Sequence, residues 1–197
     1  LDLQEAASTQ GVSGAYGLGV TFDVRDAPPN VLHRLDKPTI CALNGGAAGY
    51  GMDIALCCDI RIAAQSAKIA AAFTKRGVVP ESGGTWLLPR VVGWAKAAEI
   101  VFTGRTLSAE QCLEVGLVNQ VVPDEDLSRV TRALADEIAA NAPLAVQASK
   151  RMMRIGLSEE FDDHVHHVFL QVLPLLRSED FREGFTAFLE KREPRFQ

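Results

Sequence analysis

A glycine-rich turn between two apolar segments is the feature that most constrains the fold of this chain. Residues 39–43 are apolar with β-branched side chains at the start, which predicts a short strand. Residues 44–51 contain four glycines, and the run 52–58 is apolar on nearly all sides, as in a buried helix. Residues 60–63 alternate like a second strand, and 68–70 could form a third. The order strand, turn, helix, strand predicts an α/β fold.

Helices dominate the rest of the chain. A short amphipathic helix is predicted over 31–35, and a loop over 77–86 leads into another helix. From residue 94 the pattern is nearly all helical, apart from a strand over 117–122 that follows a helix stop at Gly116. Three stretches repeat apolar residues at helical spacing: Leu127, Val130, Leu134 and Ile138; Phe161, Val165, Val168, Val172 and Leu176; Phe181, Phe185, Phe188 and Leu189. The C-terminal third is therefore predicted to be an amphipathic helical region appended to the α/β core.

Composition excludes several classes of protein. With 197 residues and 47% hydrophobic content the chain can bury a sizeable core, and a net charge of -5 is too small for wholesale disorder. The mild acidic excess argues against binding to nucleic acid or to an anionic membrane, and no apolar run approaches the length of a spanning helix. The four cysteines lie among apolar residues rather than at zinc-ligand spacing, which predicts reduced thiols and a cytoplasmic location.

The glycine turn is the first candidate for a functional site. It lets a ligand approach the backbone closely and leads into a helix N-terminus, where N–H groups attract negative charge. Its spacing fails the dinucleotide-binding fingerprint, because Ile54 stands where the third glycine belongs, and it lacks the lysine of a P-loop. The remaining functional interpretation is an oxyanion hole, which holds a negative oxygen that develops during a reaction. Close packing of helix and strand explains the pattern equally well.

Glu81 is the second candidate. It lies at a predicted helix start, where the helix dipole favours a carboxylate. Its apolar neighbours Val78, Val79 and Trp86 could instead desolvate the carboxyl group and raise its pKa, as a general base requires. The local pattern does not decide between these two roles.

A histidine cluster is the third candidate. His164 and His167 share a predicted helical face, and Asp163 lies four residues before His167, so a metal site is conceivable. The apolar stripe of the same helix places these histidines on its flanks, which favours solvated side chains. We therefore predict no metal site.

Several segments of the chain match the motifs of one family in combination. They are Asn44–Asp59, Gly77–Gly84, Phe102–Arg105, Gly116–Val118 and Phe188–Arg192. Taken together, and extending over almost the whole chain, they resemble the enoyl-CoA hydratase/isomerase (crotonase) family. The opening Leu1-Asp2 is similar to the end of the family's A-G-x-D loop, which implies that the family's first strands and helix are absent from the sequence.

The resemblance implies a fold and a substrate class. The fold would be a spiral of ββα turns around a two-layered sheet, with 1–124 as an N-terminally incomplete core and 125–197 as a helical trimerisation region. The resemblance also implies an enzyme that acts on acyl-CoA thioesters and forms a homotrimer or a hexamer, with no cofactor beyond the CoA of its substrate. Two backbone N–H groups would stabilise an enolate, and by position they belong to Leu1 and Tyr50.

The acid/base positions depart from the hydratase pattern. Hydratases of the family use two glutamates, and the corresponding positions here hold Asp53 and Phe73, of which the second cannot exchange protons. Glu81 stands where family isomerases carry a single catalytic acid, so the resemblance favours an isomerase with Glu81 as the base. By the same resemblance, Phe188 and Lys191 would contact the CoA of a neighbouring subunit, although an apolar stripe and a terminal charge explain them equally well.

Two alternatives stay open. The chain could be a hydratase that adds water to 2-enoyl-CoA with Asp53 and Glu81 as an unusual acid/base pair. It could also be a family member that has lost catalysis and acts as a binding protein. The acidic balance disfavours RNA as the partner of such a protein.

Overall fold

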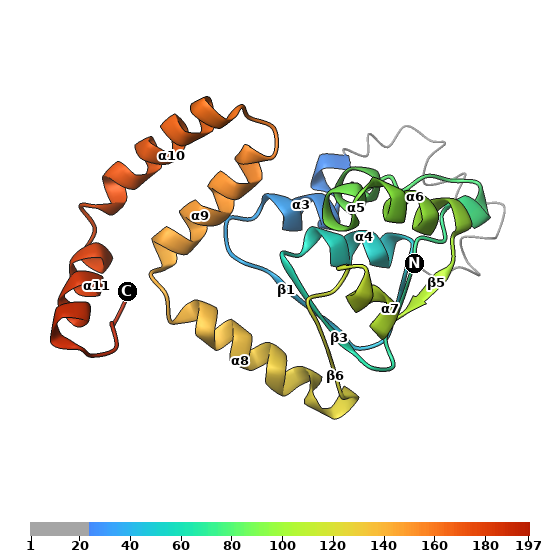
Figure 1. Ribbon diagram of the computed structural model, residues 1–197, viewed down its shortest axis with the longest axis horizontal. Helices are drawn as coiled ribbons and strands as arrows, with labels where there is room; N and C mark the ends of the chain where they lie inside the picture. Colours follow the sequence, from blue (N-terminus) through green and yellow to red (C-terminus); the bar gives the residue numbers. More distant parts are fainter. Residues whose placement is uncertain (1–23) are drawn as a thin grey trace.

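The computed structural model describes residues 24–197 and shows two small sheets covered by helices, followed by an arc of C-terminal helices (Figure 1). Predictions that fall on residues 1–23, among them the role of Leu1, lie outside the described residues. Among the described helices, none is long and apolar enough to cross a membrane.

The strands of the described residues form two three-stranded sheets. The first has the order β1-β3-β6 and is parallel throughout, with strands Ile40–Leu43, Ile60–Ala64 and Gln120–Val122. The second has the order β2-β4-β5, in which Gly46–Ala48 runs parallel to Lys68–Ala70, and Thr106–Ser108 runs antiparallel to β4. The consecutive strands β1 and β2 belong to different sheets, and so do β3 and β4. Helix α4 (Tyr50–Cys57) connects β2 to β3 along the sequence. This two-layered ββα spiral confirms the predicted fold class.

Two strand predictions differ from the structure. The predicted glycine turn contains β2, in which Ala47 pairs with Ile69 of β4. A three-residue segment carries no recognisable period, so long-range pairing decides its conformation. The strand predicted over 117–122 begins only at Gln120, because the N–H groups of Leu117 and Val118 bond to the carbonyl of Cys112 at 2.7 and 3.3 Å instead of joining a sheet.

Helices of the first part of the chain enclose α4 and the sheets. They are α3 (Pro28–Arg34), α5 (Gly84–Val92), α6 (Trp94–Thr103) and α7 (Ala109–Glu114), with short 3-10 turns at Val24–Asp26, Thr74–Arg76 and Asp124–Asp126. Helix α7 begins with a reciprocal capping box formed by Ser108 and Gln111. Helix α4 is central to the core: Met52 and Leu56 are 0% and 3% exposed. The all-round apolar character of the run 52–58 is thus explained by burial on several sides.

The C-terminal helices are α8 (Leu127–Ala139), α9 (Pro143–Gly156), α10 (Phe161–Leu175) and α11 (Glu179–Glu190). Helix α8 packs on β1 and β3 through the apolar face that its spacing predicted, with Leu127 buried and Val130 and Leu134 against the core. The division of the chain between 124 and 125 stays a prediction.

Ion pairs join α9 to Asp36, which lies between α3 and β1, and to Asp59, which lies between α4 and β3. Lys150 bonds to Asp59 at 2.7 Å, and Asp36 bonds to both Arg151 and Arg154, at 2.6 and 3.0 Å. The two arginines hold the pKa of Asp36 below its usual range, first through side-chain hydrogen bonds from Arg151 and then from Arg154.

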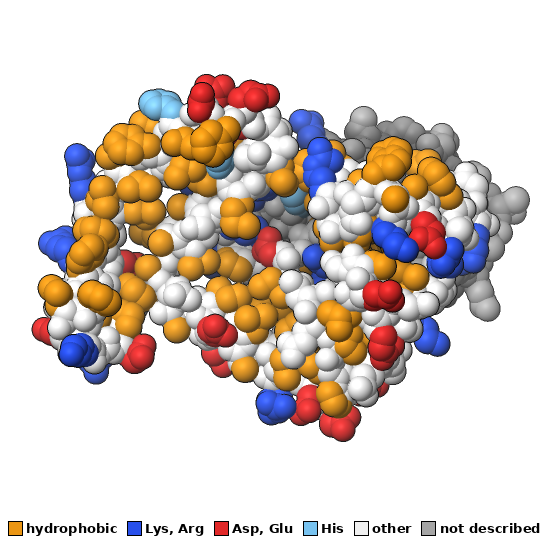
Figure 2. Space-filling view, in the orientation of Figure 1, with side chains coloured by type: hydrophobic (Ala, Val, Ile, Leu, Met, Phe, Trp, Pro, Cys, Tyr) orange, Lys and Arg blue, Asp and Glu red, His pale blue; other side chains and the backbone are white. Residues whose placement is uncertain are grey.

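Helices α10 and α11 expose their apolar faces. No residue of α10 is buried, and Phe161, Phe185 and Phe188 are 78%, 60% and 80% exposed. Figure 2 shows hydrophobic side chains gathered along this arc, at the left of the view. The two C-terminal apolar stripes therefore face away from the core of the chain.

Candidate active site at the N-terminus of helix α4

The N-terminus of α4 is formed by the glycine turn. Gly49 is the N-cap residue with φ 55°, and its own N–H bonds to the carbonyl of Ala70 in β4 at 3.0 Å. A side chain at Gly49 would be strained by this positive φ and would contact the Phe73 ring at 3.9 Å. Tyr50 is the first residue of α4, so its N–H belongs to the helix end that carries partial positive charge. The backbone here has the features of an anion site.

Asp53 lies one turn further along α4 and is completely buried, with 0% exposure. Its Oδ2 accepts a hydrogen bond from the Ser82 N–H at 3.3 Å, while Oδ1 has no partner among the described residues. Burial raises the pKa of Asp53 to about 6, and the charge of Glu81 adds to this increase, against the lowering effect of the Ser82 and Gly84 N–H groups. Asp53 is therefore a buried carboxyl group with a raised pKa.

Glu81 belongs to the segment 77–83 between the 3-10 turn at residue 76 and α5, which we call the Glu81 loop. The helix start predicted at Glu81 is wrong by three residues, because α5 begins at Gly84 with Gly83 as its N-cap at φ 101°. Glu81 is thus not a helix cap. Its side chain is exposed, so the described residues do not supply the desolvation considered from the sequence. What the loop presents is an accessible carboxylate beside the buried Asp53.

Phe73, which the resemblance places at the second hydratase position, is a core residue, 5% exposed. Its ring lies next to Gly49 of the glycine turn, and the preceding Ala72 has a φ of 53°, which is rare for a residue with a side chain. The Phe73 carbonyl accepts bonds from the N–H groups of Arg76 at 2.8 Å and Val78 at 3.2 Å. Phe73 therefore supports the turn on one side and the start of the Glu81 loop on the other.

Aromatic contacts flank the beginning of α5. Trp86 stacks edge-on with His33 of α3, with ring centroids 5.7 Å apart, and the Arg90 guanidinium lies 3.9 Å from the centre of the Trp86 ring. Burial lowers the pKa of His33, and the charge of Arg154 lowers it further. Helix α3 therefore borders the candidate site through the contact of His33 with Trp86 of α5.

The other predicted site residues lie elsewhere. Leu1 is outside the described residues. Phe188 and Lys191 lie at the end of α11, which Figure 1 places at the opposite end of the molecule from α4. Within one chain the structure therefore brings Tyr50 and Glu81 to one region, through α4 and its contacts with the loop, but not Phe188 and Lys191.

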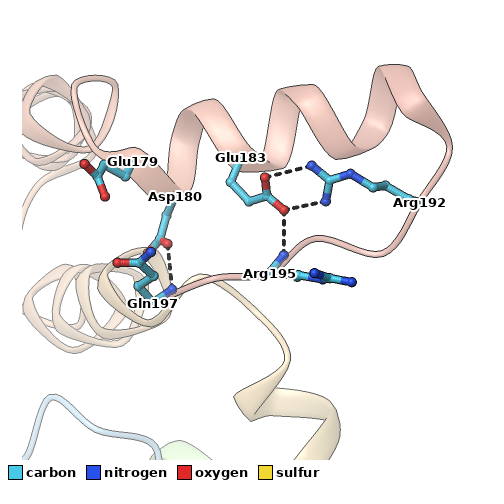
Figure 3. Close-up of a pocket in the computed structure, with 6 residues that line it drawn as sticks. All are labelled: Glu179, Asp180, Glu183, Arg192, Arg195 and Gln197. Carbon is cyan, nitrogen blue, oxygen red and sulfur yellow. Dashed lines mark hydrogen bonds and ion pairs between the residues drawn. The ribbon is translucent and has the colours of Figure 1, made fainter.

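Two hollows of about 440 Å³ lie on the C-terminal helices, not at α4. One is charged, and its lining residues bond to one another (Figure 3). The Glu183 carboxylate pairs with the Arg192 guanidinium at 2.6 Å and accepts the Arg195 backbone N–H at 2.7 Å, and the Asp180 carboxylate accepts the Gln197 backbone N–H at 3.0 Å. These bonds fasten the C-terminal tail to α11. The second hollow is apolar and includes Phe188.

The histidine cluster has a partner that the sequence did not reveal. Glu159 bonds to His164 at 2.9 Å and to His167 at 2.7 Å, and these bonds lower the pKa of Glu159. No group of histidine, cysteine and acidic side chains in residues 24–197 could hold a metal ion.

Sequence reasoning missed two groups that shape the site. Ser82 is 3% exposed and donates its N–H to the Asp53 carboxylate. Gly84 has no room for a side chain, because a Cβ there would overlap Asp53 Oδ1. Arg61, 7% exposed, donates to the carbonyls of Ala55 at 3.3 Å, Cys58 at 2.6 Å and Leu117 at 2.8 Å, which fixes the C-terminal end of α4. The adjacent glycines 83 and 84 could have indicated a close approach of the backbone next to Ser82. An arginine in a strand, such as Arg61, gives no comparable signal of its buried contacts.

The two-layered ββα spiral followed by C-terminal helices is the architecture of the crotonase fold, and comparisons with known proteins agree. A family model described as enoyl-CoA hydratase/isomerase matches residues 25–197. The chain belongs to the enoyl-CoA hydratase/isomerase family. A crystal structure of an enoyl-CoA hydratase from Bacillus anthracis superposes with a TM-score of 0.89 at 34% identity, over 99% of this chain and 74% of that one.

Relatives with different activities are similar to this chain. It is 44% identical over 165 residues to a 1,2-epoxyphenylacetyl-CoA isomerase from Escherichia coli (strain K12), covering 84% of this chain and 63% of the relative. It is 42% identical over 189 residues to a probable enoyl-CoA hydratase from Rhodobacter capsulatus, covering 94% of this chain and 74% of the relative. The matched relatives thus include both isomerases and hydratases.

Proposed function

We propose that this protein isomerises an acyl-CoA thioester by moving a double bond, with Glu81 as the base and the Tyr50 N–H as one donor of an oxyanion hole. The Glu81 carboxylate would remove a proton from C2 of a 3-enoyl thioester, and the electron pair would delocalise onto the thioester oxygen as an enolate. The same carboxyl group would return the proton at C4, giving the 2-enoyl thioester. By resemblance, the second donor to the enolate oxygen is Leu1.

One observation carries this proposal. Of the three positions where the family resemblance implies acid/base groups, Phe73 is a buried hydrocarbon, Asp53 is 0% exposed and Glu81 alone presents an exposed carboxylate. Hydration of a double bond requires both a base for the water and an acid for the carbon, whereas a double-bond shift needs one group that carries a proton between two carbons. A single accessible carboxylate near an anion site fits the second reaction.

The second candidate is a hydratase that uses Asp53 with Glu81. It is favoured by the pKa of Asp53, which burial raises to about 6 and to which the charge of Glu81 also contributes, so the two carboxyl groups interact. The family relatives named as hydratases also support it.

Product analysis with 2-enoyl-, 3-enoyl- and 1,2-epoxyphenylacetyl-CoA separates these candidates in the purified full-length protein. We expect conversion of 3-enoyl- to 2-enoyl-CoA, and we expect Glu81→Gln to reduce it by about 100-fold or more while CoA binding stays unchanged by calorimetry. An active Glu81→Gln variant would rule out Glu81 as the base. Accumulation of 3-hydroxyacyl-CoA would favour the hydratase, and thioester binding without turnover would indicate a binding protein.

We also propose that α10 and α11 pack against other copies of the chain in a homotrimer or a dimer of trimers in the cytoplasm. The exposed apolar faces of both helices and the four unpaired cysteines support this. In such an assembly Phe188 and Lys191 would contact the CoA of a neighbouring subunit, because they lie far from α4 in their own chain. Sedimentation velocity tests the assembly, and a monomer at micromolar concentration would contradict it.

A further inference from the structure

Helix α4 contacts the Glu81 loop through two side chains one turn apart. Asp53 Oδ2 accepts the Ser82 N–H at 3.3 Å, and the Cys57 thiol lies 3.9 Å from the Ser82 carbonyl, at the distance of a weak S–H···O bond. Residues spaced by four lie on one helix face. Both peptide groups of Ser82 are therefore held from α4, and Ser82 directly follows Glu81.

The other side of the Asp53 carboxylate meets Gly84, the first residue of α5. Gly84 is buried, and the nearby Gly84 N–H acts to lower the pKa of Asp53. A Cβ on Gly84 would overlap Asp53 Oδ1 and lie 2.9 Å from the Pro80 Cβ. The segment from Pro80 to Gly84 thus folds closely around the carboxylate, with Glu81 at its outer side.

The surroundings of Asp53 fit a role as a hydrogen-bond acceptor better than a role in core packing. An apolar side chain of similar volume would fill the same space without the cost of a buried carboxyl oxygen that has no partner among the described residues. The carboxyl group instead supplies an acceptor that no apolar side chain provides. Because Asp53 is 0% exposed, it reaches a bound thioester only through the loop that it holds.

We propose that Asp53 is a positioning residue that sets the Glu81 carboxylate relative to the N-terminus of α4, an inference that rests on the proposed function. Tyr50 begins α4 and Asp53 lies three residues later, so the helix itself fixes the spacing between the oxyanion donor and the anchor of the base. Proton transfer and enolate stabilisation need both groups in one geometry, and a displacement of about 1 Å can reduce the rate about 100-fold.

The test compares Asp53→Ala with Asp53→Asn in the full-length protein. The amide keeps an oxygen that accepts the Ser82 N–H, whereas alanine removes it. We expect Asp53→Ala to lower kcat for 3-enoyl-CoA isomerisation about 100-fold with KM changed less than about threefold, and Asp53→Asn to retain kcat within about fivefold of the unchanged protein. Asp124→Ala, which removes a carboxylate that accepts the Ser66 N–H at 3.0 Å away from the site, is the matched control and should leave kcat unchanged. If Asp53→Ala does not fold, Asp53→Leu, which keeps the branch at Cγ but has no hydrogen-bonding atom, replaces it.

A double variant with Glu81→Gln distinguishes a positioning role from a general structural one. If Asp53 acts only through Glu81, Asp53→Ala adds no further loss to Glu81→Gln. An active Glu81→Gln variant overturns the proposed function. An inactive Glu81→Gln with a fully active Asp53→Ala overturns the positioning role alone. Equal inactivation by Asp53→Ala and Asp53→Asn, or additive losses in the double variant, would make Asp53 a proton-transfer group in its own right and would also overturn it.

Discussion

The buried carboxyl group of Asp53 should make stability depend on pH in a direction opposite to that of most acidic residues. Its pKa in the folded chain is about 6 against a reference of 3.8, so the folded state binds the proton more tightly than the unfolded state does. The stability from this group is fully present below the unfolded pKa and is lost as the pH rises through the folded pKa. Asparagine at this position does not titrate, so Asp53→Asn should remove the effect.

The size of the effect follows from the pKa difference. Raising the pKa from 3.8 to about 6 is a difference of about 2 units, and at 1.36 kcal/mol per unit the protein should lose about 3 kcal/mol of unfolding free energy relative to Asp53→Asn between about pH 4 and pH 7. This figure already includes the Ser82 N–H bond, which stabilises the ionised carboxylate and acts to lower the pKa of Asp53. Any constant cost of introducing an amide cancels in the comparison across pH.

Urea unfolding followed by tryptophan fluorescence measures the difference, because Trp86 of α5 contacts His33 beside the site and Trp94 begins α6. Both proteins are unfolded at the same concentration at several pH values, so that subunit association affects them equally. The difference in unfolding free energy should change steadily between about pH 4 and pH 6 and be flat above about pH 7. A difference that stays constant over the whole range would refute a raised pKa at Asp53.

Two further predictions concern packing and charge. Gly84→Ala should destabilise the protein by about 1–3 kcal/mol in urea unfolding, because the new Cβ would overlap Asp53 Oδ1. The control Gly45→Ala should change stability much less, because nothing lies within 4 Å of a Cβ at that position. Equal effects of the two substitutions would contradict the close approach of Gly84 to Asp53. Asp36→Asn should destabilise by about 1 kcal/mol at neutral pH, since its partly exposed ion pairs with α9 are screened by solvent. The pKa of Asp36 is lowered, so this loss should shrink as the pH falls below the ordinary aspartate value, and a loss that persists in acid would contradict the ion pairs.

Local sequence patterns were sufficient to predict the elements whose own residues show a hydrophobic periodicity. The strand at 40–43, the buried helix after the glycine turn and the face of α8 all follow from residue spacing. Strand β2 did not, because its three residues become a strand only by pairing with β4, more than twenty residues later. The apolar stripes of α10 and α11 were visible in the sequence, but spacing gives the direction of a face on the helix and not the surface that covers it.

The site shows the same limit in a sharper form. The glycine turn and Glu81 carry recognisable motifs, so both could be singled out from the sequence. The burial of Asp53 and its bond to Ser82 could not, because they depend on the approach of two segments 29 residues apart. Glu81 was wrongly predicted at a helix start, because Gly83 takes a positive φ and the helix begins after it. Glycine permits a positive φ but does not require one, so the sequence could not predict this conformation.

The short length of α4 explains why its contacts matter. A helix of eight residues is marginal on its own, so its position depends on tertiary bonds. At its C-terminal end the Arg61 guanidinium donates to the Ala55 and Cys58 carbonyls, where positive charge complements the helix dipole. In its middle Asp53 bonds to the Glu81 loop, and before its first turn the Gly49 N–H bonds to β4. Stabilisation of an enolate works through donors that are already in place before charge develops. Contacts at three points along one short helix therefore hold the proposed oxyanion donor and the proposed base in one packed arrangement.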